Sequence, residues 1–184
     1  MSTTLSKKLA FISVAADSPD NVKTFYEKFL GIDFAQALTD QQKTFQAPLD
    51  EDGIDLMIGP KHNAQDSVVA YYAVDDLTTA LNEAKAAGGK VAWGPAALPI
   101  PPADQDDYKA LAQKFHPAGA KATTDWSTVG QGALIQDPAG NPLGLVQLAP
   151  HAQEHFNAGP GKRPLSDERV AEHQASIALG EKHK

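Results

Sequence analysis

The chain has 184 residues, of which 42% are hydrophobic, a formal net charge of −7 and no cysteine. The lack of cysteine excludes disulfides, thiolate nucleophiles and sulfur-ligated metal sites. The negative net charge argues against a nucleic-acid partner. We see neither a signal peptide nor the roughly 18-residue apolar run that a membrane span needs. We therefore expect a cytoplasmic protein.

The first half of the chain, residues 9–61, combines one helix with several strands. Residues 10–15 form an apolar run typical of a strand. A helix is expected to begin after Asp17 or Ser18, and its apolar residues recur every three or four positions until Gly31 ends it. Three short strands are predicted next, at 32–38, 43–47 and 54–58.

The second half, residues 67–150, repeats this order. A strand is predicted at 68–74, and Asp75 or Asp76 is placed to cap the helix that follows. The glycine pair 88–89 ends that helix. The remaining strands are predicted at 90–93, 132–136 and 143–148.

Two segments extend this repeated pattern. An insertion of about residues 99–128 separates two strands of the second half and contains a predicted amphipathic helix at 104–116. We expect it to form a lid or rim. The tail, residues 151–184, contains a predicted helix at about 166–179, whose thin apolar face suggests packing on the body or on a second subunit.

The turn between the last two strands is the most informative local motif. It reads Asp137-Pro-Ala-Gly-Asn141, in which proline fixes one dihedral angle while glycine and asparagine tolerate the left-handed region. Apolar runs flank it on both sides, so it predicts the tip of a β-hairpin.

The order of these elements, together with segments 17–31, 72–77 and 137–147, resembles the vicinal oxygen chelate superfamily. This superfamily includes glyoxalase I, bleomycin-resistance proteins and extradiol dioxygenases. The resemblance covers about residues 9–150. It implies the α+β fold class, with paired βαβββ modules forming a cup-shaped mixed sheet, to which this chain adds an inserted helix and a C-terminal helical tail.

In metal-dependent members of that superfamily, His and Glu on the first and last strands of each module hold a divalent metal. The metal chelates two neighbouring oxygens of the substrate. The resemblance places these four positions on Phe11, Val69, Gly144 and either Ile54 or Asp55. Because three of them have no ligating side chain, we expect no metal cofactor in the cup, and no catalytic residue can be assigned.

Strand alternation predicts which side chains line the cup, because every second residue faces the same side. The candidate ligand-binding residues are mainly apolar and aromatic, which suits a small organic molecule. The sequence therefore predicts a metal-independent binding protein that acts in sequestration, resistance or sensing. The resemblance also implies a homodimer. The candidate residues are Phe11, Ser13, Tyr71, Trp93, Tyr108 and Phe115.

Two other functions stay open. One is a glyoxalase-type lyase, isomerase or dioxygenase with non-standard metal ligands, for example Asp55 with His62 or His116. The other is an accessory protein whose cup is filled by its own side chains. One short motif, His151-x-x-Glu154-His155, matches the pattern of a zinc peptidase. It directly follows the last strand, where a turn is expected. We therefore do not predict a peptidase.

Overall fold

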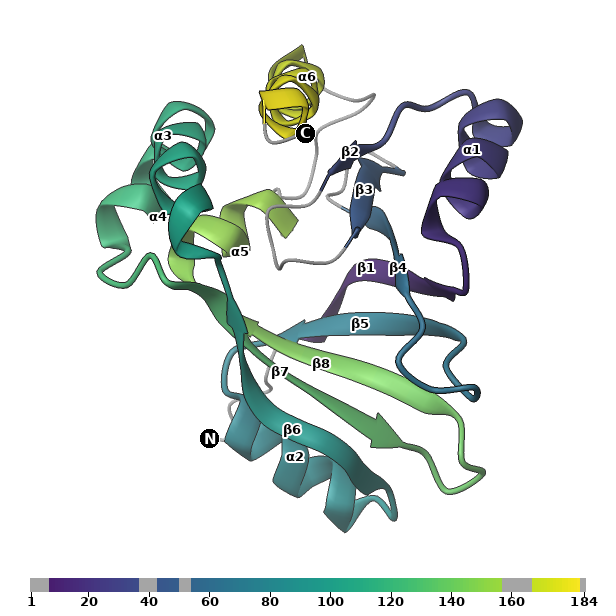
Figure 1. Ribbon diagram of the computed structural model, residues 1–184. Helices are drawn as coiled ribbons and strands as arrows, with labels where there is room; N and C mark the ends of the chain where they lie inside the picture. Colours follow the sequence, from purple (N-terminus) through teal and green to yellow (C-terminus); the bar gives the residue numbers. More distant parts are fainter. Residues whose placement is uncertain (1–6, 37–42, 50–53, 157–166, 183–184) are drawn as a thin grey trace.

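Two βαβββ modules form one eight-stranded sheet in the computed structural model, which describes residues 7–36, 43–49, 54–156 and 167–182 (Figure 1). The first module consists of β1 (Lys7–Ala16), α1 (Pro19–Leu30), β2 (Ala35–Gln36), β3 (Phe45–Pro48) and β4 (Asp55–Pro60). The second consists of β5 (Val68–Val74), α2 (Leu77–Ala86), β6 (Lys90–Pro99), β7 (Thr128–Gln136) and β8 (Pro142–Leu148).

The two modules meet at the centre of the sheet. The strand order is β2-β3-β4-β1-β5-β8-β7-β6, with β1 parallel to β4 and antiparallel to β5. The registers place Phe11 opposite both Asp55 and Tyr71, and Tyr71 opposite Gly144. These four residues form one row across the central strands. The structure therefore confirms the predicted fold class of paired βαβββ modules in a mixed sheet.

Three hydrophobic clusters pack against the faces of this sheet. Ile58 and its neighbours pack between the first module and α1, where Val22 and Tyr26 contribute. Leu77 and Leu81 of α2 pack against the second module. The third cluster lies on the opposite, concave face, and its buried members are Ala10, Phe11, Ala73, Ile100, Val129, Val146, Leu148 and Ala152.

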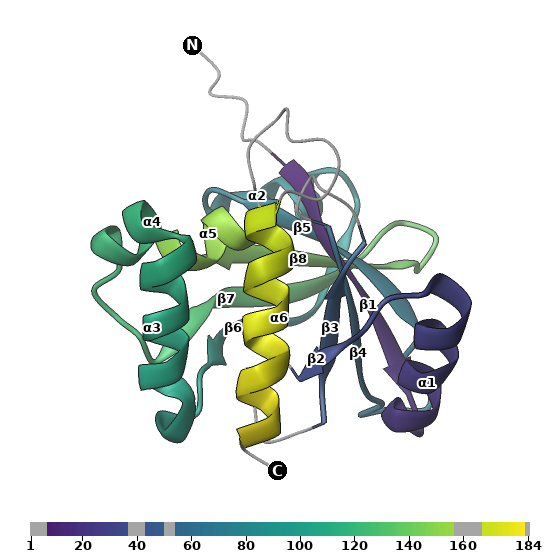
Figure 2. The same ribbon diagram turned by 90° about the horizontal axis from the view of Figure 1, so that it is seen from above.

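Four helices and a short 3-10 turn cover the concave face (Figures 1 and 2). The 3-10 turn η1 (Pro102–Asp104), α3 (Gln105–Phe115) and α4 (Pro117–Ala122) lie between β6 and β7, whereas α5 (Pro150–Phe156) and α6 (Asp167–Lys182) follow β8. Figure 2 shows α6 running between α3 and β2. A bond of 2.6 Å between His173 Nε2 and the Asp33 carbonyl oxygen attaches α6 to the first module.

The structure corrects several sequence expectations. A turn was expected after the last strand, but α5 begins there with Pro150 at its first position, which suits a helix start. The expected strand at 90–93 continues to Pro99 as β6. Helix α4 was not predicted either. Of the two possible caps of α2, Asp76 is the one used, since its side chain accepts a 2.6 Å bond from the Thr79 backbone N–H.

The predicted hairpin turn between β7 and β8 is confirmed. Asp137 Oδ1 accepts bonds of 2.8 Å from the backbone N–H groups of Ala139 and Asn141. Hydrogen bonds from the Asn141 side chain and backbone hold the pKa of Asp137 below its ordinary value. Among the described residues, no helix is long and apolar enough to cross a membrane.

Candidate functional site

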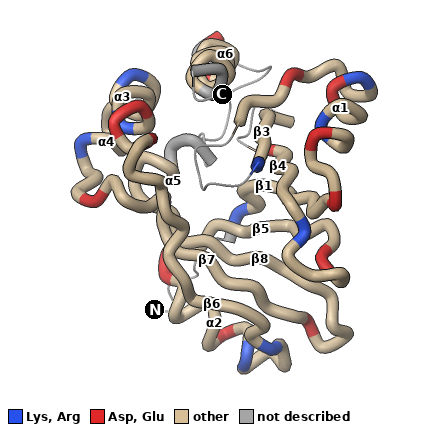
Figure 3. The backbone as a smooth tube through the Cα atoms, viewed as in Figure 1, with Lys and Arg blue, Asp and Glu red and all other residues tan. Residues whose placement is uncertain are grey.

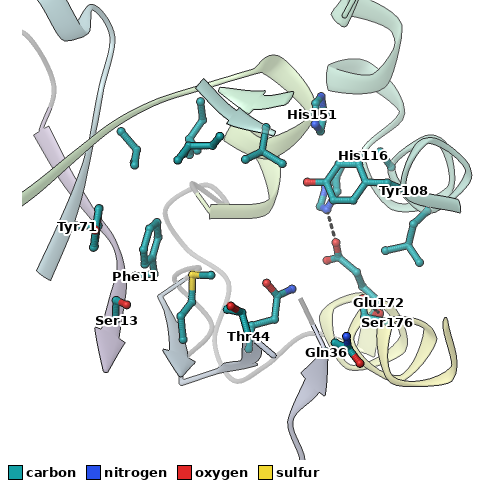
Figure 4. A pocket seen from close by; sticks show the side chains of 18 residues that line it. Phe11, Ser13, Gln36, Thr44, Tyr71, Tyr108, His116, His151, Glu172 and Ser176 are labelled. Atoms are coloured by element: carbon teal, nitrogen blue, oxygen red, sulfur yellow. Dashed lines mark hydrogen bonds and ion pairs between the residues drawn. The ribbon is translucent and has the colours of Figure 1, made fainter. Parts of the chain in front are cut away.

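A cavity of about 220 Å³ lies on the concave side, between the sheet and the helices that cover it (Figure 4). Strand residues supply a mostly apolar wall, which includes Phe11, Met57, Tyr71 and Val146. Helical residues supply a second, more polar wall. Neither lysine nor arginine is among the lining residues that the structure describes. The tube view shows that charged residues concentrate on helices and loops rather than on the central strands (Figure 3).

The apolar wall is built around a stacked pair of rings. The ring centroids of Phe11 and Tyr71 lie 4.5 Å apart with an interplanar angle of 15°. The Tyr71 ring lies directly over Gly144, where a Cβ atom would overlap it. Burial, and to a smaller extent the charge of Asp66, raises the pKa of Tyr71, so its phenol stays protonated at neutral pH. Glycine at position 144 therefore makes room for the tyrosine ring.

The registers also identify the fourth metal position of the resemblance. Gly144 lies opposite Tyr71, two residues beyond Val69 on β5. In the first module, Asp55 is the β4 partner of Phe11. The same offset of two residues leads from Asp55 to Met57. The sequence had placed this position at Ile54 or Asp55, two or three residues earlier in the chain.

The donor set at these four positions does not fit a hard divalent metal. Phe11, Met57, Val69 and Gly144 offer no carboxylate or imidazole, the side chains that usually bind such ions. The alternative ligands Asp55 and His62 do not line the cavity, whereas His116 does. Within the described part of the chain, no group of three His, Cys, Asp or Glu side chains is arranged to hold a metal ion.

The polar wall contains a short hydrogen bond between the insertion and the C-terminal helix. His116 is the C-cap residue of α3, and its Nε2 lies 2.6 Å from Glu172 Oε1 on α6 (Figure 4). The two side chains are 15% and 7% exposed. A buried, short contact of this kind is much less screened than a surface pair. It joins two helices that cover the cavity.

His151 lies beside this pair, in the first turn of α5, and only 1% of the residue is exposed. Its ring stacks on Trp126 at 4.8 Å and meets the edge of Tyr108 at 5.2 Å. Its Nδ1 lies 3.0 Å from Thr123 Oγ1. Burial, and secondarily the neighbouring His116, lowers the pKa of His151 to about 4. The ring is therefore neutral at pH 7.

A close approach of two short helices makes this arrangement possible. At Gly119 of α4, a Cβ atom would come within 2.9 Å of the Cα atom of His151. The carbonyl oxygen of Gly119 also accepts a 2.8 Å bond from Thr123 Oγ1. Glycine thus lets α4 pack against the start of α5 and brings the threonine hydroxyl to the imidazole.

Tyr108 completes the polar wall. Burial raises the pKa of Tyr108 well above its ordinary value, and the nearby charge of Glu172 adds to the effect. Its phenol therefore keeps its proton and can act as a hydrogen-bond donor at any physiological pH.

The six residues proposed from the sequence are not all brought together. Phe11, Ser13, Tyr71 and Tyr108 line the cavity. Trp93 does not; it lies on the edge strand β6 and is 46% exposed. Phe115 does not line it either, although it belongs to α3, and Lys114 Nζ lies 4.8 Å from its ring centroid.

Sequence analysis missed the role of three lining residues. His116 was considered as an alternative metal ligand, His151 within a peptidase motif, and Glu172 was not considered. They come from three separate helices, so no spacing in the sequence connects them. The one local signal was Pro150, which places His151 in a first helical turn. The side chains of Glu154 and His155 lie outside the described part of the structure.

No protein-family model and no curated protein matches the sequence. Solved structures match at low identity, with TM-scores below 0.5. A glyoxalase/bleomycin resistance protein/dioxygenase superfamily member from Vibrio splendidus is 13% identical, with a TM-score of 0.45, and the match covers 79% of this chain and 99% of that one. The methylmalonyl-CoA epimerase of Mycobacterium tuberculosis is 14% identical, with a TM-score of 0.49 and coverage of 81% and 93%.

A third match is a structure described as an NAD-dependent benzaldehyde dehydrogenase from Legionella pneumophila. It is 9% identical, with a TM-score of 0.47, and the match covers 75% of this chain and 97% of that one. The three proteins are named for different activities. This likeness therefore assigns no activity to the present chain, and the function has to be argued from the cavity.

Proposed function

We propose that this protein binds a small, flat and largely apolar organic molecule in the cavity without a metal ion, and acts in sequestration, resistance or sensing. The observation that carries the proposal is the stacked pair of Phe11 and Tyr71, which occupies the centre of the concave face beside the cavity. Aromatic rings that face a cavity favour flat ligands through stacking and burial of apolar surface.

The size and charge of the cavity support the same class of ligand. A volume of about 220 Å³ is below the 300–1,000 Å³ typical of drug-sized ligands, so it suits a molecule of one or two rings. Among the described residues, the lining has no Lys or Arg to neutralise a carboxylate or phosphate. A neutral ligand therefore fits better than an anion.

Naphthalene is a suitable first probe, and titration calorimetry at pH 7 measures its affinity. Ala112 on α3 is 5% exposed and lines the cavity, so Ala112→Phe should fill it and weaken binding at least about tenfold. Ala110 is exposed on the same helix and supplies the matched control, since Ala110→Phe adds the same ring outside the cavity. An absence of saturable binding of both naphthalene and 2-naphthol, or equal affinities in the two variants, would refute the proposal.

The proposal includes a homodimer. Its support is an exposed apolar surface on α1, where Phe25 and Phe29 are 57% and 73% exposed and stack with centroids 5.6 Å apart. Exposed apolar patches of this kind often mark contact surfaces. Light scattering should give twice the mass of the chain, and the double variant Phe25→Ser, Phe29→Ser should give the single mass. A wild-type protein that stays monomeric at high concentration contradicts this part of the proposal.

A further inference from the structure

One of the residues that line the cavity, His151, has a buried nitrogen atom without a hydrogen-bond partner among the described residues. No described residue bonds Nε2 of His151, although the residue is only 1% exposed. The same residue lines the cavity, beside Tyr108 and His116 (Figure 4). An unpaired buried polar atom lowers stability, so native proteins keep few of them, and each calls for a specific reason.

The hydrogen bonds of Thr123 determine the chemical character of this nitrogen. Thr123 Oγ1 donates its single hydrogen to the Gly119 carbonyl oxygen at 2.8 Å. Toward Nδ1 of His151, 3.0 Å away, the hydroxyl must then act as an acceptor. Nδ1 therefore carries the ring hydrogen. In a neutral imidazole this leaves Nε2 with a lone pair, as an acceptor.

Packing fixes the direction in which this lone pair points. Trp126 stacks on one face of the His151 ring, with an interplanar angle of 22°, while Tyr108 meets it edge-on at 80°. The ring cannot turn without disturbing both contacts and the bond to Thr123. The acceptor is therefore oriented before any ligand arrives, which reduces the entropy lost on binding.

We infer that the ligand of this cavity carries a hydroxyl or N–H group that donates a hydrogen bond to Nε2 of His151. This inference rests on the function proposed above and narrows its ligand class to neutral, flat molecules with one donor, such as phenols and aryl amides. The donor would lie at the helical end of the cavity, and the flat apolar part would extend toward Phe11 and Tyr71. The cavity then has one recognition point for each part of the ligand.

Three probes of nearly equal shape test the inference by titration calorimetry at pH 7: naphthalene, 2-naphthol and 2-methoxynaphthalene. 2-Naphthol has the donor, whereas its methyl ether has an oxygen but no donor. We expect 2-naphthol to bind at least about tenfold more tightly than the ether, because a site with a buried acceptor rejects ligands that cannot pair it. If all three bind equally well, the inference is overturned and the proposed function stands. If none binds, both are overturned.

Variants assign the preference to the imidazole. In His151→Phe, which keeps a flat ring between Trp126 and Tyr108, the affinity ratio of 2-naphthol to its ether should fall to near one. The matched variant His62→Phe, at an exposed histidine outside the cavity, should keep the wild-type ratio. A donor preference that persists in His151→Phe overturns the inference.

A second pair of variants tests the role of the hydroxyl, and it also serves if His151→Phe does not fold. Thr123→Ser keeps a hydroxyl that can bond Nδ1, so the preference for 2-naphthol should be retained. Thr123→Val removes the hydroxyl and no longer holds the hydrogen on Nδ1, so the preference should decrease by at least about threefold. Equal ratios in the serine and valine variants contradict the assigned tautomer.

Discussion

The two walls of the cavity are built in different ways. The sheet wall is mostly apolar, comes from the strands, and centres on the Phe11–Tyr71 stack over Gly144. The helical wall is polar and joins side chains from the insertion and the tail, among them His116 and Glu172. The comparison suggests that the repeated modules supply a general apolar surface, whereas the added helices supply the selectivity.

The largest expected effect concerns the sheet wall. Gly144→Glu places a carboxylate where the Tyr71 ring lies. Overpacking costs about 1–3 kcal/mol, and burying an unpaired charge adds several more, so we expect a loss of at least about 4 kcal/mol in the free energy of unfolding. Urea denaturation measures it. The variant should gain no tight metal binding.

A double-mutant cycle isolates the contact between the glycine and the ring. Gly144→Ala alone should cost about 2 kcal/mol, because the added methyl group overlaps Tyr71. In a Tyr71→Ala background, the same change should cost less than about 1 kcal/mol. Additive effects of the two substitutions would show that the ring does not exclude a side chain at position 144.

The next largest effect concerns the helical wall, where His151 should make the stability of the protein depend on pH. The pKa of His151 falls from its ordinary value of 6.5 to about 4 in the folded protein. Between pH 6.5 and pH 4, His151 binds a proton in the unfolded chain but not in the folded protein. Stability therefore decreases as the pH falls from 6.5 to 4. Below pH 4 this residue causes no further loss. A shift of this size corresponds to about 3 kcal/mol.

Denaturation curves from pH 7 to pH 4 test this expectation. The slope of stability against pH in this window should be smaller in His151→Phe than in the wild type, since the variant has no imidazole to protonate on unfolding. His62→Phe, which removes an exposed imidazole outside the cavity, is the matched control. Parallel curves for wild type and His151→Phe would mean that His151 is protonated equally in both states.

The sequence predicted the sheet wall much better than the helical wall. Strand alternation and the two repeated modules placed Phe11, Ser13 and Tyr71 on one face, because a strand has a fixed period of two. The sequence did not reveal that Glu172 would reach His116, since the two residues are 56 positions apart and no local rule determines how separate helices pack. The role of Gly144 was also hidden until the register showed Tyr71 beside it.

A moderate effect is expected where the tail meets the insertion. Glu172→Ala removes the partner of His116, and a short hydrogen bond between ionisable groups contributes about 1.5–3 kcal/mol, so α6 should become less stable by about 2 kcal/mol. Hydrogen exchange of the α6 backbone measures this directly. Gln174→Ala, at an exposed position on the same helix, is the matched control. If α6 amides exchange equally in both variants, the hydrogen bond between His116 and Glu172 does not hold the helix in place.

The smallest effect is expected at Trp93, and it tests where the sheet wall ends. Trp93 was predicted to bind the ligand, but it is 46% exposed on an edge strand and does not line the cavity. Trp93→Ala should therefore change stability by less than about 0.5 kcal/mol and leave the affinity for naphthalene unchanged. It also leaves Trp126 as the single tryptophan, stacked on His151. Ligand binding should then alter the fluorescence of Trp126. If Trp93→Ala instead loses affinity for naphthalene, the binding site extends to the outer edge of the sheet.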